Sequence, residues 1–138
     1  MPVLAIGLIA AGNQLTAANM SLYGGNEGLV NITSGDNNVA VGDQSLADIT
    51  TGSQNTAIGE MSLKSNTTGA GNTALGRFSL YSNSTGGDNV AVGVGALTAN
   101  IEGSQNTAIG SAAGSNNVSG TGNVFIGYMA GSQTSGSN

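Results

Sequence analysis

The pentapeptide Asn55-Thr56-Ala57-Ile58-Gly59 decides the fold, because close copies of it recur along most of the chain. The closing glycines of successive copies keep a constant 17-residue step, without insertion or deletion. A fixed period is the sequence signature of repeat architectures, in which each repeat stacks on its neighbours. The other copies are Asn38-Val39-Ala40-Val41-Gly42, Asn72-Thr73-Ala74-Leu75-Gly76, Asn89-Val90-Ala91-Val92-Gly93, Asn106-Thr107-Ala108-Ile109-Gly110 and Asn123-Val124-Phe125-Ile126-Gly127.

Further columns of residues keep the same 17-residue step. Four residues after the motif glycine come Leu46, Leu63, Leu80 and Leu97, and then Gly114 and Gly131. A second glycine column consists of Gly52, Gly69, Gly86, Gly103 and Gly120, and a second asparagine column of Asn66, Asn83, Asn100 and Asn117.

The period also predicts the domain organisation. One period before Gly42 lies Gly25, with Leu29, Ile32 and Gly35 in column, so residues 21–37 are predicted to form a degenerate first coil. Terminal repeats are commonly atypical, because one of their faces has no neighbour. Six coils follow over residues 38–131. Residues 1–20 break the period and are predicted to be a separate N-terminal segment, and residues 132–138 a polar C-terminal tail.

The repeat favours β-structure over helix. Glycine falls in every turn-length window and costs a helix about 1 kcal/mol each relative to alanine. The residues Thr56-Ala57-Ile58 alternate as in a strand, and we expect the two glycines of each repeat to form corners with positive φ. Successive coils would stack as parallel strands about 4.8 Å apart. The sequence therefore predicts an all-β parallel β-solenoid.

The columns suggest a core and a ladder. We expect the aliphatic residue before each motif glycine to fill the coil interior together with the leucines, and the alanine before it to face outward. This interior would contain Val41, Ile58, Leu75, Val92, Ile109, Ile126, Leu46, Leu63, Leu80 and Leu97. The asparagine that opens each motif can bond its copies above and below. The predicted ladder is Asn38, Asn55, Asn72, Asn89, Asn106 and Asn123.

A coil of this kind buries little apolar surface against the backbone entropy of a whole repeat. Association of copies would bury the remaining face, and an outward alanine would permit close approach, so we expect a homotrimer. Met61, Phe78 and Met129 are candidate intersubunit contacts. The alternative is that they are isolated exposed apolar residues, which most proteins carry.

Composition excludes several classes of function. The 138 residues include no cysteine and no histidine, which excludes disulfides, thiolate metal sites and histidine-based catalysis. The formal charge is −5, and the only basic side chains are Lys64 and Arg77. Two cations cannot neutralise a phosphate backbone, so nucleic acid is not an expected partner.

The N-terminal segment carries the densest apolar run of the chain, from Val3 to Ala11. It lacks the basic region of a signal peptide, the alternative interpretation, and it is too short to span a bilayer. We therefore expect a protein made in the cytoplasm, without membrane insertion or a leader of its own. The predicted docking residues are Val3, Leu4, Ile6, Leu8 and Ile9.

No catalytic, metal or cofactor site is expected, and we do not expect an enzyme. Asp43 and Glu60 share one column on adjacent coils, about 5 Å apart at the backbone, but two solvated surface acids explain them better than paired catalytic carboxylates. The glycine- and aspartate-rich pattern of calcium-binding β-rolls is missing.

Residues 55–76, with Asn66-Thr67-Thr68-Gly69 between two motif copies, resemble the head repeats of trimeric autotransporter adhesins. They resemble even more the 17-residue repeats of phage tail-fibre and related virion appendage proteins. The resemblance extends over about residues 21–131. It implies a left-handed parallel β-roll, three chains per assembly, and a role in attachment or virion structure.

The function that the resemblance implies is a structural phage virion protein, namely a trimeric spike, tail fibre or capsid decoration. Its partners would be other copies of itself, other virion proteins through the N-terminal segment, and a host-surface glycan as a candidate ligand. The sequence does not decide between tail fibre and capsid decoration. One alternative is the head of a bacterial surface adhesin, disfavoured by the expected lack of a leader and membrane barrel. The other is a tailspike depolymerase, disfavoured by the lack of histidine and of clustered carboxylates.

Overall fold

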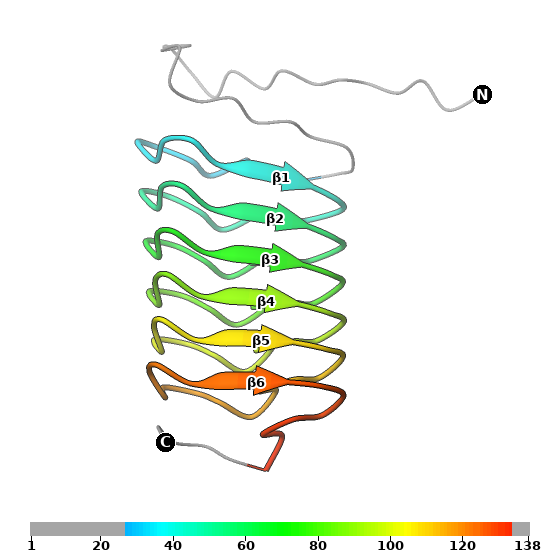
Figure 1. Ribbon diagram of the computed structural model, residues 1–138. Helices are drawn as coiled ribbons and strands as arrows, with labels where there is room; N and C mark the ends of the chain where they lie inside the picture. Colours follow the sequence, from blue (N-terminus) through cyan, green and yellow to red (C-terminus); the bar gives the residue numbers. More distant parts are fainter. Residues whose placement is uncertain (1–26, 134–138) are drawn as a thin grey trace, which may run out of the picture.

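The computed structural model describes residues 27–133, which form a stack of coils with one strand per coil (Figure 1). The six strands pair in parallel in the order β1-β2-β3-β4-β5-β6. This confirms the predicted all-β parallel β-solenoid, in which one repeat forms one coil. The strands are β1 (Val39–Val41), β2 (Thr56–Ile58), β3 (Thr73–Leu75), β4 (Val90–Val92), β5 (Thr107–Ile109) and β6 (Val124–Ile126).

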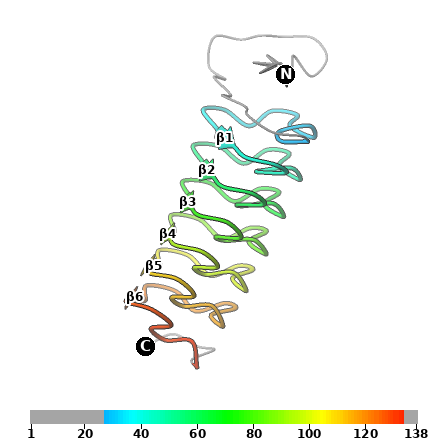
Figure 2. The same ribbon diagram turned by 90° about the vertical axis from the view of Figure 1, so that its right-hand side faces the viewer.

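Every strand pairs with the next at a shift of one repeat, for example Ala57 with Ala74. Seen from the side, the coils form a stack of loops with all strands along one edge (Figure 2). Five steps of about 4.8 Å give a sheet about 24 Å long from β1 to β6. The predicted docking residues of the N-terminal segment, and residues 134–138 of the predicted tail, lie outside the described residues.

Hydrogen bonds between coils continue beyond the three-residue strands. The backbone N–H of Leu46 donates to the carbonyl of Ser62 at 3.1 Å, and Thr50 N–H donates to the carbonyl of Thr67 at 3.0 Å. In the other direction, Met61 N–H donates to the carbonyl of Asp43 at 2.8 Å. Each coil is thus hydrogen-bonded to the next on several sides of the loop, and this pattern continues along the stack.

The strands present the opposite face to the interior from the one that we predicted. The alanine at the centre of each of the first five strands is completely buried, whereas Ile58, Leu75 and Ile109 are about two-fifths exposed. The leucine column is buried as expected. The residues wrongly assigned to the interior are Val41, Ile58, Leu75, Val92, Ile109 and Ile126, of which Val41 and Val92 are half-buried and the others exposed.

The width of the coil explains this reversal. The interior already holds a leucine and asparagine side chains from the rest of the loop, which leaves room on the strand for alanine only. The last coil shows the exchange directly, because Phe125 replaces alanine where Gly114 and Gly131 replace leucine. A Cβ atom added to Gly114 would lie 2.6 Å from the Phe125 ring and 3.0 Å from Leu97. One large residue therefore fits on either side, but not on both.

The asparagines that open the motif form a buried ladder along the strand edge of the interior. The side-chain Nδ2 of Asn89 donates to Asn72 Oδ1 at 3.0 Å and to the carbonyl of Gly103 at 2.8 Å. Its Oδ1 accepts from the backbone N–H and the Nδ2 of Asn106, both at 3.0 Å. The same bonds join every pair from Asn38 to Asn123, as the sequence predicted.

A second buried ladder runs through Asn66, Asn83, Asn100 and Asn117, with Nδ2 to Oδ1 distances of 2.8 to 3.2 Å. Both ladders share acceptors, since Asn55 and Asn66 donate to the carbonyl of Gly69 at 2.9 Å. Within residues 27–133, the only buried side-chain polar atom without a partner is Asn117 Oδ1, where this second ladder ends. The two ladders thus satisfy the polar interior almost completely.

The two glycine columns require glycine for different physical reasons. The motif glycines adopt φ from +117° to +134°, as expected for corners. The second column, which includes Gly69 and Gly86, was also predicted to need positive φ, and this is wrong. A Cβ atom on Gly69 would lie 2.4 Å from the carbonyl oxygen of Gly86 and 2.3 Å from Asn66 Oδ1. Glycine is required there because adjacent coils and the ladder approach too closely for a side chain.

Several other positions adopt a left-handed backbone without being glycine. The four repeat leucines have φ of 50° to 51°, and the residue two positions before each leucine is also left-handed, as in Met61 (φ 56°). Ala112 (φ 56°) has the same conformation two positions before Gly114, which replaces the leucine of its coil. Each such residue costs roughly 1–2 kcal/mol relative to the ordinary right-handed conformation. Their regular recurrence shows that inter-coil bonding imposes the backbone shape.

The interior position of alanine can be tested by adding volume. Replacing Ala91 with leucine should lower the free energy of unfolding by about 1–3 kcal/mol or more, because the coil has no space for it. Thr85→Leu adds a comparable apolar group at an exposed position and should change stability by less than about 0.5 kcal/mol. Thermal unfolding followed by circular dichroism measures both. Equal tolerance of the two substitutions would contradict an interior alanine column.

The ladder predicts an unusually large effect for an asparagine substitution. Asn89→Ala removes the Nδ2 bonds to Asn72 Oδ1 and to the Gly103 carbonyl, and it removes the acceptor of both the backbone N–H and the Nδ2 of Asn106. At about 1–3 kcal/mol for each buried polar group left unpaired, the loss should exceed about 3 kcal/mol. Chemical denaturation should show Thr85→Ala to be near neutral. A loss below about 1 kcal/mol for Asn89→Ala would indicate that the ladder contributes little.

The left-handed positions offer a stabilising substitution. Ala112→Gly should raise the melting temperature, because glycine tolerates φ of 56° and already occupies this column as Gly95. Ala113→Gly, one residue along at a buried position, should lower the melting temperature through lost packing and added chain entropy. Scanning calorimetry of the pair tests the idea. Two shifts of the same sign and size would argue against backbone strain at Ala112.

Candidate functional site

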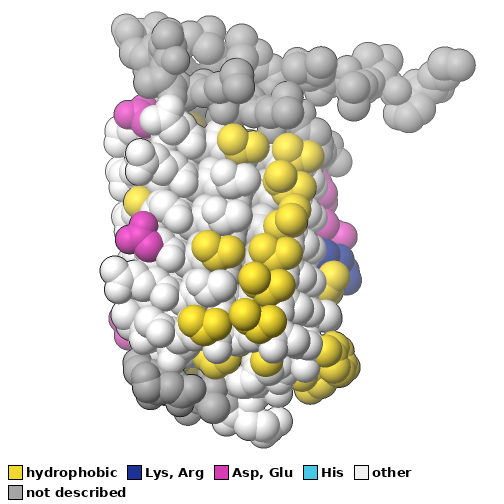
Figure 3. Space-filling model, viewed as in Figure 1, with side chains coloured by type: hydrophobic (Ala, Val, Ile, Leu, Met, Phe, Trp, Pro, Cys, Tyr) yellow, Lys and Arg dark blue, Asp and Glu magenta, His cyan; other side chains and the backbone are white. Residues whose placement is uncertain are grey.

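The outward face of the sheet carries a column of large apolar side chains, which we name the aliphatic stripe. Figure 3 shows it as a nearly continuous line of hydrophobic side chains over the strands. The strand pairing places its members directly above one another. The aliphatic stripe consists of Val41, Ile58, Leu75, Val92, Ile109 and Ile126.

The stripe is exposed along the middle of the stack as well as at its end. Ile58 is 39% exposed, Leu75 45% and Ile109 42%. A second outward column, two residues earlier on each strand, consists of threonine and valine and broadens the apolar face at Val39, Val90 and Val124. Contiguous exposed apolar surface of this kind usually marks an interaction site. Sequence reasoning missed the stripe because it placed the same residues inside.

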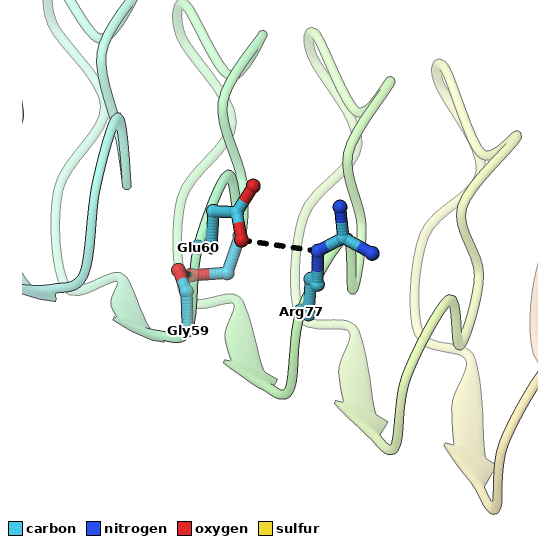
Figure 4. A network of polar contacts seen from close by, with 4 residues as sticks. Gly59, Glu60 and Arg77 are labelled. Atoms are coloured by element: carbon cyan, nitrogen blue, oxygen red, sulfur yellow. Dashed lines mark hydrogen bonds and ion pairs between the residues drawn. The ribbon is translucent and has the colours of Figure 1, made fainter.

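The corner that follows β2 and β3 carries a different group of side chains, which we name the aromatic corner: Glu60, Lys64, Arg77, Phe78 and Tyr81. Arg77 Nε donates to Glu60 Oε2 at 3.0 Å across the two coils (Figure 4). The Arg77 guanidinium lies 4.3 Å from the centre of the Phe78 ring. Phe78 meets Tyr81 edge-to-face at 5.5 Å, and Lys64 Nζ lies 5.9 Å from the Tyr81 ring centre.

The aromatic corner connects two neighbouring coils with contacts of modest strength. The Glu60 and Arg77 side chains are about half exposed, so their ion pair contributes at most about 1 kcal/mol. Both basic side chains of the sequence are engaged here, with an acid or an aromatic ring as their partner. The corner is therefore best explained as an inter-coil contact that also leaves polar groups at the surface.

The other candidate intersubunit contacts have mixed environments. Phe78 and Met61 are half-buried, and Phe78 packs within the aromatic corner. Met129 is 44% exposed in the last coil, beside Tyr128. None of these three lies on a strand, and the structure does not align them into a stripe of their own, since Gly95 and Ala112 interrupt their column.

The acidic side chains do not form an apparent chemical site within residues 27–133. Glu60 pairs with Arg77, as described above, and its column neighbour Asp43 is half-buried on the preceding coil. No group of three or more acidic side chains in this range could hold a metal ion. The same residues include no helix with the length and apolar character needed to cross a membrane.

Comparison with known proteins adds no family assignment. No family model, no curated protein and no solved structure gives a significant match to this chain. The fold thus rests on the strand pairing and the hydrogen bonds described above.

Proposed function

We propose that the chain is a non-catalytic structural protein of a phage virion, forming a homotrimeric spike, tail fibre or capsid decoration of left-handed β-rolls. The observation that carries the proposal is the straight stack of coils with an uncovered aliphatic stripe along its sheet. A stack of this kind extends by adding coils, which suits a spike or fibre. Its uncovered face suits assembly from several copies.

The thin interior supports an assembly. Apart from the polar ladders, the coils of β2 and β3 each bury one alanine and one leucine as their main apolar side chains. Much of the aliphatic surface of the coil is on the outside instead. Apolar burial is the dominant favourable term in folding and in association. A stripe buried between copies would add to the stack the stabilisation that its own interior lacks.

The use of the repeated polar side chains supports a structural role over a catalytic one. The motif asparagines bond to one another, as described for Asn89. The buried serine before the leucine also bonds locally, since Ser62 Oγ donates to the carbonyl of Gly59 at 2.9 Å and Ser79 Oγ to that of Gly76 at 2.8 Å. Repeated residues that hold the coils together explain the repeat without a substrate.

The proposal also includes how the trimer attaches to the virion and to the host. Residues 1–20 would dock the trimer on other virion proteins through their apolar run, and the polar sides of the coils would face the host, with a surface glycan as candidate ligand. The support for the docking role is the sequence of that segment alone. In this arrangement the protein is located in the virion.

The state of assembly is the first test. Light scattering of the purified full chain should give three times the chain mass of 13.4 kDa, because the exposed stripe needs partners. A folded monomer at micromolar concentration would contradict the homotrimer.

The location of the protein is the second test, measured by antibody labelling and electron microscopy of particles from the organism that encodes the chain. Labelled particles support a virion protein, whereas label confined to the cell surface supports the adhesin alternative.

A further inference from the structure

The aromatic corner concentrates the positive charge of a chain that is otherwise acidic. The sequence contains two basic side chains against seven acidic ones, and both basic ones, Lys64 and Arg77, lie at this corner. The corner positions of the coil that follows Arg77, residues 94–99, contain no acid. An anion that approaches Arg77 from that coil therefore meets no like charge there. The acids on this side of the loop all precede Arg77, and they are Asp43, Asp48 and Glu60.

Two contacts restrain the Arg77 side chain and leave its outer edge unused. Nε donates to Glu60 Oε2 at 3.0 Å, and the guanidinium lies 4.3 Å from the centre of the Phe78 ring. The two terminal nitrogens, Nη1 and Nη2, point away from Glu60 (Figure 4), and within residues 27–133 no hydrogen bond engages them. Paired N–H groups on a planar guanidinium match the two oxygens of a carboxylate. Because the side chain is already restrained, it loses less conformational entropy when it binds one.

Apolar surface lies next to this edge. Val94, which follows Arg77 in its column, is 53% exposed. Phe78 has Gly95 as its column neighbour in the next coil, and a Cβ atom added to Gly95 would have no heavy atom within 4 Å. The space next to Phe78 is therefore open on the side of the following coil. Aromatic and aliphatic side chains beside a few placed polar groups are the usual lining of small-molecule sites, and the C–H face of a sugar ring packs against them.

Lys64 supplies further donors at the other end of the aromatic pair. Its Nζ lies 5.9 Å from the centre of the Tyr81 ring, and no hydrogen bond engages it within the part of the chain that the structure describes. Tyr81 meets Phe78 edge-to-face at 5.5 Å. A row of contacts thus runs from Arg77 through the two rings to Lys64, with unused N–H groups at both ends. This arrangement suits a ligand that carries a negative charge on a ring with apolar C–H groups.

We propose that the aromatic corner binds an acidic sugar, a saccharide unit whose carboxylate lies on Nη1 and Nη2 of Arg77 and whose ring packs against Phe78 and Val94. The inference rests on the proposed attachment to a surface glycan, and it specifies the position of the site and the chemical class of the ligand. Phe78, considered above as an intersubunit contact, contacts the ligand instead. Each chain has one such site, because the column of Arg77 contains no other basic residue.

Titration of the full chain with glucuronic acid, galacturonic acid and N-acetylneuraminic acid, followed by nuclear magnetic resonance, tests the site. At least one of these acids should bind at one molecule per chain, with the largest shifts at Arg77, Phe78 and Val94. Its methyl ester should bind at least about tenfold more weakly, because the ester lacks the charge that Arg77 recognises. Acetate carries the carboxylate without the ring and should also bind at least about tenfold more weakly.

Two acidic substitutions provide matched variants. Val94→Asp places a negative charge beside Arg77, in a column that already contains Asp43, and should raise the dissociation constant at least about tenfold. Thr85→Asp makes the same change in net charge at an exposed position outside the corner, in the column of Glu102, and should leave the dissociation constant within about twofold. Arg77→Lys keeps the charge but loses the paired N–H groups, and should raise the dissociation constant at least about fivefold. Circular dichroism should show the same β-structure in all three variants.

The outcomes separate this inference from the proposed function. A trimer located in virions that binds none of the three acids, or that binds acetate and the methyl esters equally well, overturns the acidic-sugar site and leaves the structural role standing. Several bound molecules per chain, or equal effects of Val94→Asp and Thr85→Asp, also overturn the site. A chain that binds one acidic sugar per copy at Arg77, but is labelled only at the cell surface, supports the site and overturns the location in the virion.

Discussion

The buried asparagine ladder is the interaction on which the rest of the structure depends. Each ladder amide donates to the asparagine of the coil before it and to a glycine carbonyl, and accepts from the asparagine of the coil after it. These bonds form only if every coil has the same length, so one inserted residue would leave several buried polar groups unpaired. The cost of such groups in a poorly solvated interior explains the constancy of the 17-residue period.

The ladders also determine how the apolar residues are distributed. Because two rows of asparagine occupy part of the interior, the coils of β2, β3 and β4 accommodate one leucine opposite the strand alanine, and glycine where carbonyls of adjacent coils approach. The larger aliphatic side chains of the strands are left outside, where they align into the stripe. The same constraint that closes the interior therefore creates an apolar outer face, and this face supports assembly as the proposed role of the protein.

Much of the fold could be predicted from the sequence, because a strict period reports the register of stacked coils directly. The leucine column and the motif asparagines followed from this period. The inner face of the strand did not, since Thr56-Ala57-Ile58 alternates but does not say which side is enclosed, and the larger aliphatic seemed the better core residue. The signal that could have decided it is the last coil, where Phe125 replaces alanine and Gly114 and Gly131 replace leucine. Such an exchange of volumes indicates that the two columns face each other.

The most direct test of the account is the exchange of asparagine side-chain amide protons with deuterium, followed by nuclear magnetic resonance with asparagine-specific labelling. The account predicts strong protection of the Nδ2 protons of Asn72 and Asn89. Both side chains are buried, and each Nδ2 donates to a glycine carbonyl as well as to the asparagine of the preceding coil. Those of Asn116, an exposed residue whose side chain donates to the Ser132 carbonyl outside the two ladders, should exchange much faster. If the ladder amides exchanged as fast as Asn116, the interior would not be held by asparagine bonds, and the central claim would be wrong.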